Sequence, residues 1–378
     1  MKRLRVMAAG LGWGVLERRH VKSVAGMSFE PADSVFPAVT CVAQATMRTG
    51  LAPSGHGMVA NGRWFDDLCK PMFWEQSASL VRGRRVWEGL RAEGGTVGLY
   101  FFQQSLGESV DAVVSPAPIH KHGGGMAMSC YTRPTGAAAE IERRLGRFPL
   151  WRYWGPLASP NVGDACIDWF EAATDICDVD EAYLYLPTLD YAAQKYGPGS
   201  SRDDAAFAAL CRQLERLAGL CERRGAALSV TGDYEIAPVT APPVRPNVLL
   251  REKGLFRTRP VAGRAYPDFY QSSAFAMCDH EVCVVCGERR DEAARLLLAT
   301  GDYEEAGGDG AILLARRGSW CEYKWWTSRR EAPDYASHVD IHNKPGFDPK
   351  ELFFFGRGVV KGTHGRRCLV ANTGGEKT

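Results

Sequence analysis

The amino-acid sequence predicts an α/β protein with a mostly parallel central sheet flanked by helices. Short apolar segments of strand length recur along the chain, and helix-like or loop-like stretches separate them. Continuous apolar strands are typical of sheets that are buried on both faces, as parallel sheets are. The candidate strands comprise residues 6–11, 97–102, 182–186, 226–231, 280–285 and 311–315.

Composition narrows the class of protein. The chain has 378 residues, of which 45% are hydrophobic and 24% charged. Such a chain can bury a large core, and these values exclude extended disorder and collagen-like sequence. Its formal net charge is only +2, with the two signs interspersed. We therefore expect a small-molecule partner rather than a nucleic-acid polymer or a membrane, because no bulk attraction to polyanions arises.

Cysteine usage and the N-terminal segment predict a cytoplasmic protein. Most of the 12 cysteines are scattered singly, which is typical of a reducing compartment. Residues 1–16 combine a basic start with a short apolar run, but Trp13 and Gly14 interrupt the run and no cleavage site follows. We expect a buried strand there. No segment reaches the roughly 18 apolar residues of a membrane helix.

Helical periodicity is clearest at residues 203–224. Ala206, Leu210, Leu214 and Leu217 recur at three- and four-residue spacing, with charged residues between them. This pattern predicts an amphipathic helix that leads into the strand at 226–231. Two stretches rich in proline and glycine are expected to be irregular insertions within a single domain spanning residues 1–378, namely about 107–156 and 240–267.

Residues 31–64 contain the most informative motif. Pro37 ends a strand-like entry, and residues 41–48 are compatible with a helix that stops at Gly50. We expect Thr40 to cap this helix, with its hydroxyl near unpaired N–H groups and the positive end of the helix dipole. A phosphate group would bind favourably there.

The spacing of this motif resembles the type I phosphodiesterase/nucleotide pyrophosphatase family of the alkaline phosphatase superfamily. Thr40 is followed by residues 49–53 (Thr-Gly-Leu-Ala-Pro), residues 56–58 (His-Gly-Met) and Asn61. The resemblance implies an alkaline-phosphatase-like fold, Thr40 as nucleophile and Asn61 as a support for the reacting phosphoryl oxygens. In isolation, Thr40 would be an ordinary N-cap and Asn61 a turn residue, but their joint spacing favours the family.

Downstream motifs continue the resemblance, with departures. The resemblance implies that Asp190, Gln194 and His364 hold one metal ion, although Gln194 stands where the family has histidine. It implies Asp233 and Thr40 for a second metal ion, but Tyr234 replaces the histidine that follows the aspartate, and the aspartate expected near the end of the first strand is missing.

These departures weaken the case for two metal sites. Zinc needs three or four ligands, and a neutral amide oxygen suits magnesium or manganese better. We expect a divalent cation at one site rather than two, with zinc implied by the resemblance and magnesium or manganese left open. His280 is a further candidate ligand. A further candidate set alternates along the chain and comprises His338, Asp340 and His342. A surface strand with a polar face would equally explain this pattern.

The sequence therefore predicts a metal-dependent hydrolase of phosphodiesters or related phosphoryl compounds, with a covalent phospho-threonine intermediate. The alternative is a non-catalytic or repurposed relative with a degraded metal site that binds a phosphorylated small molecule. Transfer to an acceptor other than water is also left open. Residues 151–154 and 324–326 are rich in aromatic residues and are candidates for the wall of the substrate pocket.

Overall fold

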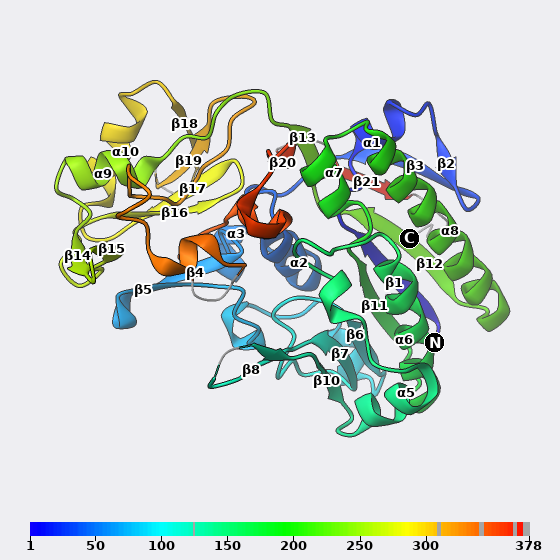
Figure 1. Ribbon diagram of the computed structural model, residues 1–378. Coiled ribbons are helices and arrows are strands. Elements are labelled where there is room, and N and C mark those ends of the chain that lie inside the picture. The colour runs from blue at the N-terminus through cyan, green and yellow to red at the C-terminus, as the bar shows by residue number, and fades with distance from the viewer. Residues whose placement is uncertain (124, 308–310, 340–343, 366–368, 373–378) are drawn as a thin grey trace.

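The computed structural model describes residues 1–123, 125–307, 311–339, 344–365 and 369–372. Within these residues, a nine-stranded sheet forms the largest unit (Figure 1). Its strands, in spatial order, are β10 (Cys130–Arg133), β7 (Ala112–Pro116), β6 (Val97–Tyr100), β11 (Glu181–Leu186), β1 (Arg3–Ala8), β12 (Ala227–Gly232), β21 (Leu369–Asn372), β3 (Met27–Ala32) and β2 (Ser23–Val24).

The middle of this sheet is parallel. β7, β6, β11, β1 and β12 pair in parallel, whereas β10 on one side and β21, β3 and β2 on the other are antiparallel. β1 lies centrally, with Val6 opposite Leu184 of β11 and Val230 of β12, and all three side chains are fully buried. The predicted α/β class with a mostly parallel central sheet is confirmed.

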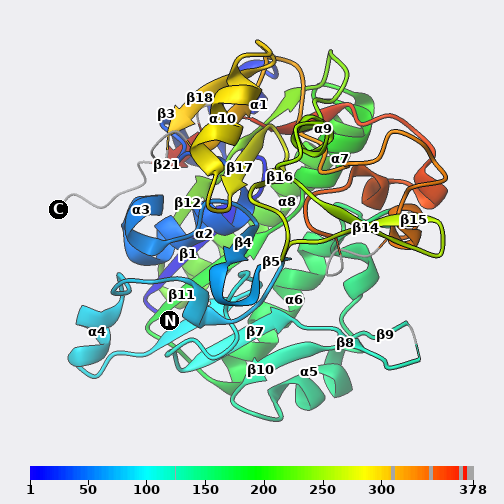
Figure 2. The same ribbon diagram turned by 90° about the vertical axis from the view of Figure 1, so that its left-hand side faces the viewer.

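Helices cover both faces of the sheet. α6 (Val162–Ile176) and α8 (Ser201–Arg224) lie on one face, and α2 (Thr40–Thr49) lies on the other (Figure 2). α8 begins where the Ser200 hydroxyl accepts a hydrogen bond from the Asp203 N–H, and it ends at the left-handed Gly225. Its apolar stripe is buried, so the helix predicted at 203–224 is confirmed.

A second sheet lies apart from the first (Figure 1). It is antiparallel, in the order β16 (Phe275–Asp279), β17 (Val282–Cys286), β19 (Ile312–Ala315) and β18 (Tyr303–Gly307). Its own core includes Phe256, Phe275 and Trp325. Placing residues 280–285 and 311–315 in the parallel sheet was therefore wrong, because a short apolar run does not reveal which sheet it joins.

The two stretches expected to be irregular contain regular elements. Residues 107–156 include β7 and β10 of the main sheet, so that expectation is wrong for these strands. The other elements of the two stretches are β8 (Ile119–His120), β9 (Met126–Ala127), α5 (Ala137–Leu145), the short 3-10 helix η3 (Leu150–Arg152), α9 (Pro246–Glu252), β14 (Thr258–Val261) and β15 (Arg264–Pro267).

The remaining elements are short. The helices are α1 (Trp13–Glu17), α3 (Pro53–His56), α4 (Glu88–Ala92), α7 (Asp190–Tyr196) and α10 (Arg290–Leu298), and the strands are β4 (Gly62–Phe65), β5 (Lys70–Phe73), β13 (Glu235–Pro238) and β20 (Gly362–Gly365). Further 3-10 turns are η1 (Asp66–Leu68), η2 (Ala78–Leu80), η4 (Asp334–Ser337), η5 (Pro349–Leu352) and η6 (Phe354–Gly356). No helix within the described residues is both long and apolar enough to cross a bilayer.

The topology directs several polar segments to the carboxyl ends of the parallel strands. α7 follows β11, and Asp233 follows β12 directly. β13 then pairs with β20, which sets Ile236 opposite His364. Ligand sites in open α/β sheets lie at this edge, where strand ends and helix starts meet. The fold therefore points to this edge as the place to look for the site.

Candidate active site

Thr40 is the first residue of α2 rather than its cap. The extended residue Val39 precedes the helix, with φ −130° and ψ 158°, and no side chain caps at that position. The Thr40 hydroxyl instead lies 3.2 Å from the Tyr234 hydroxyl. Predicting Thr40 as a side-chain cap was wrong, because α2 begins at Thr40 itself and its hydroxyl contacts Tyr234; Thr40 is among the residues that line the adjacent cavity.

Asn61 is the residue that satisfies the first turn of α2. Its Oδ1 accepts a hydrogen bond from the Cys41 N–H at 2.9 Å. Its own backbone N–H and Nδ2 donate to the two carboxylate oxygens of Asp279, at 2.6 and 3.1 Å. Asn61 is buried and does not line the cavity. The structure thus places it beside Thr40 with its side chain engaged, tying α2 to β16 of the second sheet.

Asp190, Gln194 and His364 converge at the strand ends. Asp190 and Gln194 are four residues apart on α7 and therefore share a face of that helix, while His364 comes from β20. The Asp190 Oδ1 accepts hydrogen bonds from Gln194 Nε2 at 2.8 Å and pairs with His364 Nε2 at 2.9 Å. Gln194 Nε2 lies 3.2 Å from His364 Nε2. The three predicted ligands of one metal ion are thus brought together.

This donor set fits one divalent cation. A carboxylate, an imidazole nitrogen and an amide oxygen are all recognised metal ligands. Gln194 Oε1 is buried and has no hydrogen-bond partner in the described part of the chain. A half-turn of the Gln194 amide would direct this oxygen toward Asp190 and His364, where only a cation would offset its repulsion from the carboxylate. Among described residues, no cluster of three histidine, cysteine, aspartate or glutamate side chains could hold a metal ion.

Asp233 and its neighbours do not fit a second cation. The Asp233 Oδ1 is engaged by the N–H groups of Gly10, at 2.9 Å, and Tyr234, at 2.8 Å. The carboxyl is fully buried, and burial raises its pKa well above the usual value, although the Gly10 N–H opposes this. A single carboxyl beside two neutral hydroxyl groups falls short of the ligands a divalent ion requires.

Tyr234 is the functional residue that sequence reasoning did not assign. Its hydroxyl contacts Thr40 and donates to Asp190 Oδ1 at 3.3 Å, so it links the hydroxyl to the carboxylate. Its ring stacks on His364 with a centroid distance of 3.8 Å. Burial, followed by the charges of Asp190 and Asp233, raises its pKa well above 10.0, so the phenol is neutral. The sequence did contain one indication of its role, because Tyr234 stands where the family motif has histidine.

His280 joins the same cluster through ring stacking. It lies in the turn between β16 and β17 with φ 57°, and its ring stacks on His364 at 3.4 Å and on Phe347 at 4.2 Å. Burial lowers its pKa well below 6.5, so the ring is neutral. His338 is exposed, with its Nδ1 3.0 Å from the Asp334 carbonyl, away from this cluster. Asp340 and His342 lie outside the described residues.

The cavity beside Thr40 has aromatic walls and three amide side chains. Besides Gln194, the amides are Gln76 and Gln103, and Gln76 Nε2 donates to Gln103 Oε1 at 2.7 Å. Trp154 lines the cavity, as the sequence predicted for residues 151–154, whereas Trp325 and Trp326 are buried in the second sheet's core. The aromatic walls include Trp74, Tyr153, Trp154, Tyr185, Tyr191 and Phe347.

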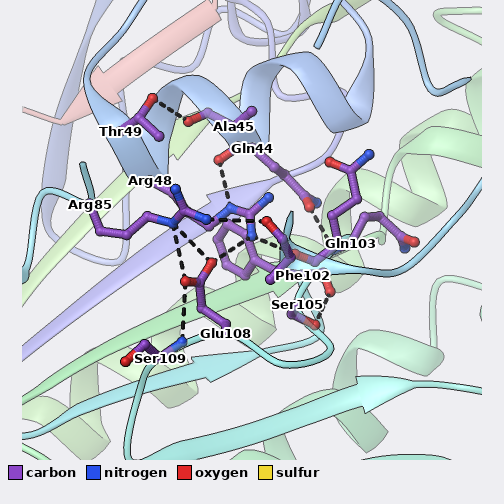
Figure 3. Close-up of polar contacts among 12 residues, drawn as sticks. Gln44, Ala45, Arg48, Thr49, Arg85, Phe102, Gln103, Ser105, Glu108 and Ser109 are labelled. Atoms are coloured by element: carbon purple, nitrogen blue, oxygen red, sulfur yellow. Dashed lines mark hydrogen bonds and ion pairs between the residues drawn. The ribbon is translucent and has the colours of Figure 1, made fainter. Parts of the chain in front are cut away.

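A buried arginine fixes the loop that carries Gln103. Arg48 of α2 is fully buried and donates to the Gln104 carbonyl at 2.7 Å and to Glu108 at 3.3 Å (Figure 3). Gln44, on the same helix, accepts a hydrogen bond from the Gln103 N–H at 2.7 Å (Figure 3). Burial lowers the pKa of Arg48 to about 10, which leaves it charged at neutral pH. α2 therefore positions both Thr40 and the opposite wall of the cavity.

Comparison with known proteins is consistent with this site. The family model for type I phosphodiesterase / nucleotide pyrophosphatase matches residues 10–348. The fold is similar to that of phosphonoacetate hydrolase from Sinorhizobium meliloti in complex with phosphonoformate, with a TM-score of 0.62, 16% identity and coverage of 98% of this chain and 89% of that one.

Two mammalian structures show the same fold. Murine ectonucleotide pyrophosphatase/phosphodiesterase 5 has a TM-score of 0.56 at 15% identity, covering 98% of this chain and 88% of that one. The human protein of that name has a TM-score of 0.57 at 14% identity, with 98% and 87% covered. No curated protein sequence matches the chain. Because the family model matches most of the sequence, the chain belongs to the type I phosphodiesterase / nucleotide pyrophosphatase family, whose members are phosphodiesterase- and pyrophosphatase-type hydrolases.

Proposed function

We propose that this protein hydrolyses a phosphodiester or related phosphoryl bond in a small molecule, with Thr40 as the nucleophile. The observation that carries the proposal is the position of the Thr40 oxygen. It lines the cavity at the start of α2, and a single phenol, that of Tyr234, separates it from the Asp190 carboxylate. The helix start places partial positive charge where a phosphoryl group would approach Thr40.

The hydrogen bonds indicate how Thr40 is prepared for attack. When the Tyr234 hydroxyl donates its hydrogen bond to Asp190, its oxygen can accept a hydrogen bond from the Thr40 hydroxyl. This arrangement orients a lone pair of the Thr40 oxygen into the cavity. In the attack, the bond from Thr40 Oγ to phosphorus forms, the bond to the ester leaving oxygen breaks, and the Thr40 proton passes through the Tyr234 hydroxyl to Asp190. Water then attacks phosphorus, the bond from Thr40 Oγ to phosphorus breaks, and Thr40 regains its proton.

Asp190, Gln194 and His364 are the residues that would hold one divalent cation, which is zinc by family resemblance. Bound there, the cation would supply positive charge to the reacting phosphoryl oxygens. His280 supports His364 by stacking, with the two rings parallel within 10°, and its Nδ1 accepts a long hydrogen bond from the His364 N–H at 3.5 Å. Asn61 supports the site indirectly, because it holds the first turn of α2 in place.

The proposed substrate is a small phosphorus compound. Similar structures were obtained with phosphonoformate, phosphonoacetate and AMP bound. Gln76, Gln103 and the aromatic walls of the cavity offer hydrogen-bonding and stacking surfaces to the leaving group.

Kinetics of two Thr40 variants test the proposal. With a chromogenic phosphodiester as substrate and divalent cations supplied, Thr40→Ala should lose at least about a thousandfold in kcat/KM, because no oxygen remains to attack. Thr40→Ser is the matched control and should retain a measurable part of the activity, since it keeps the hydroxyl. Turnover by Thr40→Ala at the wild-type rate would remove Thr40 from this role.

One observation favours a second candidate function, in which the protein binds a phosphorylated small molecule without hydrolysing it. Asp190 Oδ1 is already surrounded by hydrogen-bonding groups of Gln194, His364 and Tyr234, so the protein itself can compensate this carboxylate. Elemental analysis of protein purified without chelators separates the candidates. Folded protein without metal, which binds AMP but shows no turnover after zinc is added, would favour the second.

A further inference from the structure

A second cavity adjoins the catalytic one and has a different chemistry. Tyr153, Pro187 and Tyr191 line both cavities and form the wall between them. The second cavity lies among the segment after η3, the end of α7, the start of α6 and the first half of α8. It is separate from the Thr40 hydroxyl, which lines only the first cavity.

Four cationic side chains line this second cavity, and no carboxylate does. They come from three different segments and comprise Arg152, Lys195, Arg202 and Arg212. None of the four forms an ion pair with a carboxylate in the part of the chain that the structure describes. Three of these side chains are exposed and Lys195 is half-buried, so solvent weakens their mutual repulsion, and an anion in the cavity would be attracted by all four.

Four acidic residues of the flanking helices are paired with other arginines. At the start of α8, Asp203 and Asp204 are paired with Arg19 at 2.7 and 2.8 Å. On the neighbouring face of α6, Asp168 and Glu171 are paired with Arg216 at 2.7 and 3.0 Å. Arginines close by therefore have carboxylate partners, and the cations of the cavity do not.

Aromatic faces hold three of these cations instead. The Arg152 guanidinium lies 4.5 Å from the centre of the Trp151 ring, and Arg202 lies 5.9 Å from that of Tyr196. The Lys195 ammonium lies 5.5 Å from both Tyr196 and Phe353. Contacts of this kind position a cation without neutralising its charge. α6 also begins at Val162 in the lining of this cavity, so the positive end of its dipole adds to the field.

We propose that this second cavity binds an oxyanion group, such as a phosphate, sulfate or carboxylate, of a small molecule. Guanidinium groups match these anions because they donate two parallel hydrogen bonds. The anion has two possible sources, since the cavity shares a wall with the catalytic one. It is either a second anionic group of the substrate or a separate small anion.

Calorimetric titration with inorganic pyrophosphate tests the site without any turnover. The test variant is Arg202→Gln combined with Arg212→Gln, and the control is Arg223→Gln, an exposed arginine of α8 that does not line the cavity. Wild type and control should bind pyrophosphate equally. The double variant should bind at least about tenfold more weakly, because two charge-assisted hydrogen bonds to the anion are lost.

Two outcomes would overturn the proposal. One is no binding of pyrophosphate to the wild-type protein at low salt. The other is unchanged binding by the double variant, which would place the anion in the catalytic cavity. Because this titration needs no hydrolysis, it stays informative if Thr40 is not a nucleophile. Thermal unfolding of both variants checks that they fold.

Kinetics then distinguish the two sources of the anion. If the cavity holds part of the substrate, the double variant should raise KM for a substrate with a second anionic group, leave its kcat unchanged, and leave KM unaltered for one without. If it holds a separate anion, pyrophosphate should change the kcat of wild type but not that of the double variant. Either result supports the site. If neither change is observed, the proposal is contradicted.

Discussion

Two donor sets meet at the carboxyl edge of the main sheet, and they differ in what occupies the space between the ligands. Asp190, Gln194 and His364 converge from α7 and β20, and the Gln194 amide oxygen is left without a partner. Around Asp233, backbone N–H groups engage one carboxylate oxygen, the other is also buried without a partner among the described residues, and the Tyr234 phenol reaches Thr40. We propose that the first set holds a cation and that the phenol stands in place of a second one.

On the proposed function, this comparison describes a centre with one cation and one hydrogen bond from Tyr234 that orients the Thr40 hydroxyl. A hydrogen bond from a neutral phenol orients a hydroxyl but supplies less positive charge than a metal ion. Substitutions in the two sets should therefore affect different properties. Those in the first set should change cation binding and turnover, and those in the second set should change turnover and stability.

Asp190→Ala should have the largest effect. It removes the only carboxylate of the first donor set and the acceptor of the Tyr234 hydroxyl, so we expect no cation binding and a loss of at least about a thousandfold in kcat. Cation content is measured by elemental analysis and turnover with the same diester. Asp168→Ala, at an exposed ion pair on α6, is the control and should change neither. A variant that still bound one cation would refute the assignment.

Tyr234→Phe comes next. It removes the hydrogen bond to Thr40 while keeping the ring that stacks on His364, so we expect kcat to fall by roughly tenfold to a hundredfold. Cation content should stay at the wild-type value, because the phenol is not among the residues proposed to hold the cation. A fall in cation content together with kcat would show that Tyr234 is a ligand and that the two sets are not distinct.

Asn61→Ala should act mainly on stability. It leaves the buried Asp279 carboxylate and the Cys41 N–H with fewer partners, which should lower the free energy of unfolding by about 1–3 kcal/mol. Urea unfolding measures this change. Asn161→Ala is the matched control, since that asparagine precedes α6 without a capping hydrogen bond from its side chain. Equal effects of the two substitutions would contradict the role assigned to Asn61.

Asp233→Asn should give the smallest effect, an increase of a few degrees in Tm at neutral pH. Because burial raises the pKa of this carboxyl in the folded protein, the folded state binds more protons than the unfolded state. Wild-type stability from this group is therefore present at low pH and is lost as pH rises above the unfolded value of 3.8. Asparagine keeps the acceptor for Gly10 and carries no charge.

The pH dependence sharpens this last prediction. The advantage of Asp233→Asn over wild type should be greatest near neutral pH and should shrink in acid, as measured by thermal unfolding between pH 4 and pH 8 in the absence of added metal. A variant that is less stable than wild type at neutral pH, and that also binds less cation, would mean that Asp233 holds a second metal ion after all.

Local patterns predicted much of the architecture, including the start of α2 near Thr40. Helix α8 and strand β1 follow from apolar spacing alone, because their burial depends on their own sequence. Thr40, Asp190 and His364 are far apart in the chain, and family spacing was needed to place them in one site. In the structure, Thr40 and Asp190 are linked through the Tyr234 hydroxyl, a contact the sequence did not predict.

Features that depend on tertiary pairing were not predictable. Residues 280–285 have the composition of a buried parallel strand, but their antiparallel partners at 275–279 and 312–315 decide the sheet they join. Asn61 became a helix anchor because Asp279 approaches from another sheet. The basic cavity brings together three segments whose individual charges look ordinary in the sequence.

The stereochemical outcome at phosphorus tests the central claim most directly. Two successive in-line displacements, first by Thr40 and then by water, invert the configuration twice, so a diester chiral at phosphorus should yield product with net retention. The measurement uses the isotopically chiral diester that wild-type protein hydrolyses fastest, with the product configuration read by phosphorus NMR. Net retention is the result that Thr40 catalysis predicts. Net inversion would mean that water attacks directly and that no phosphothreonine forms.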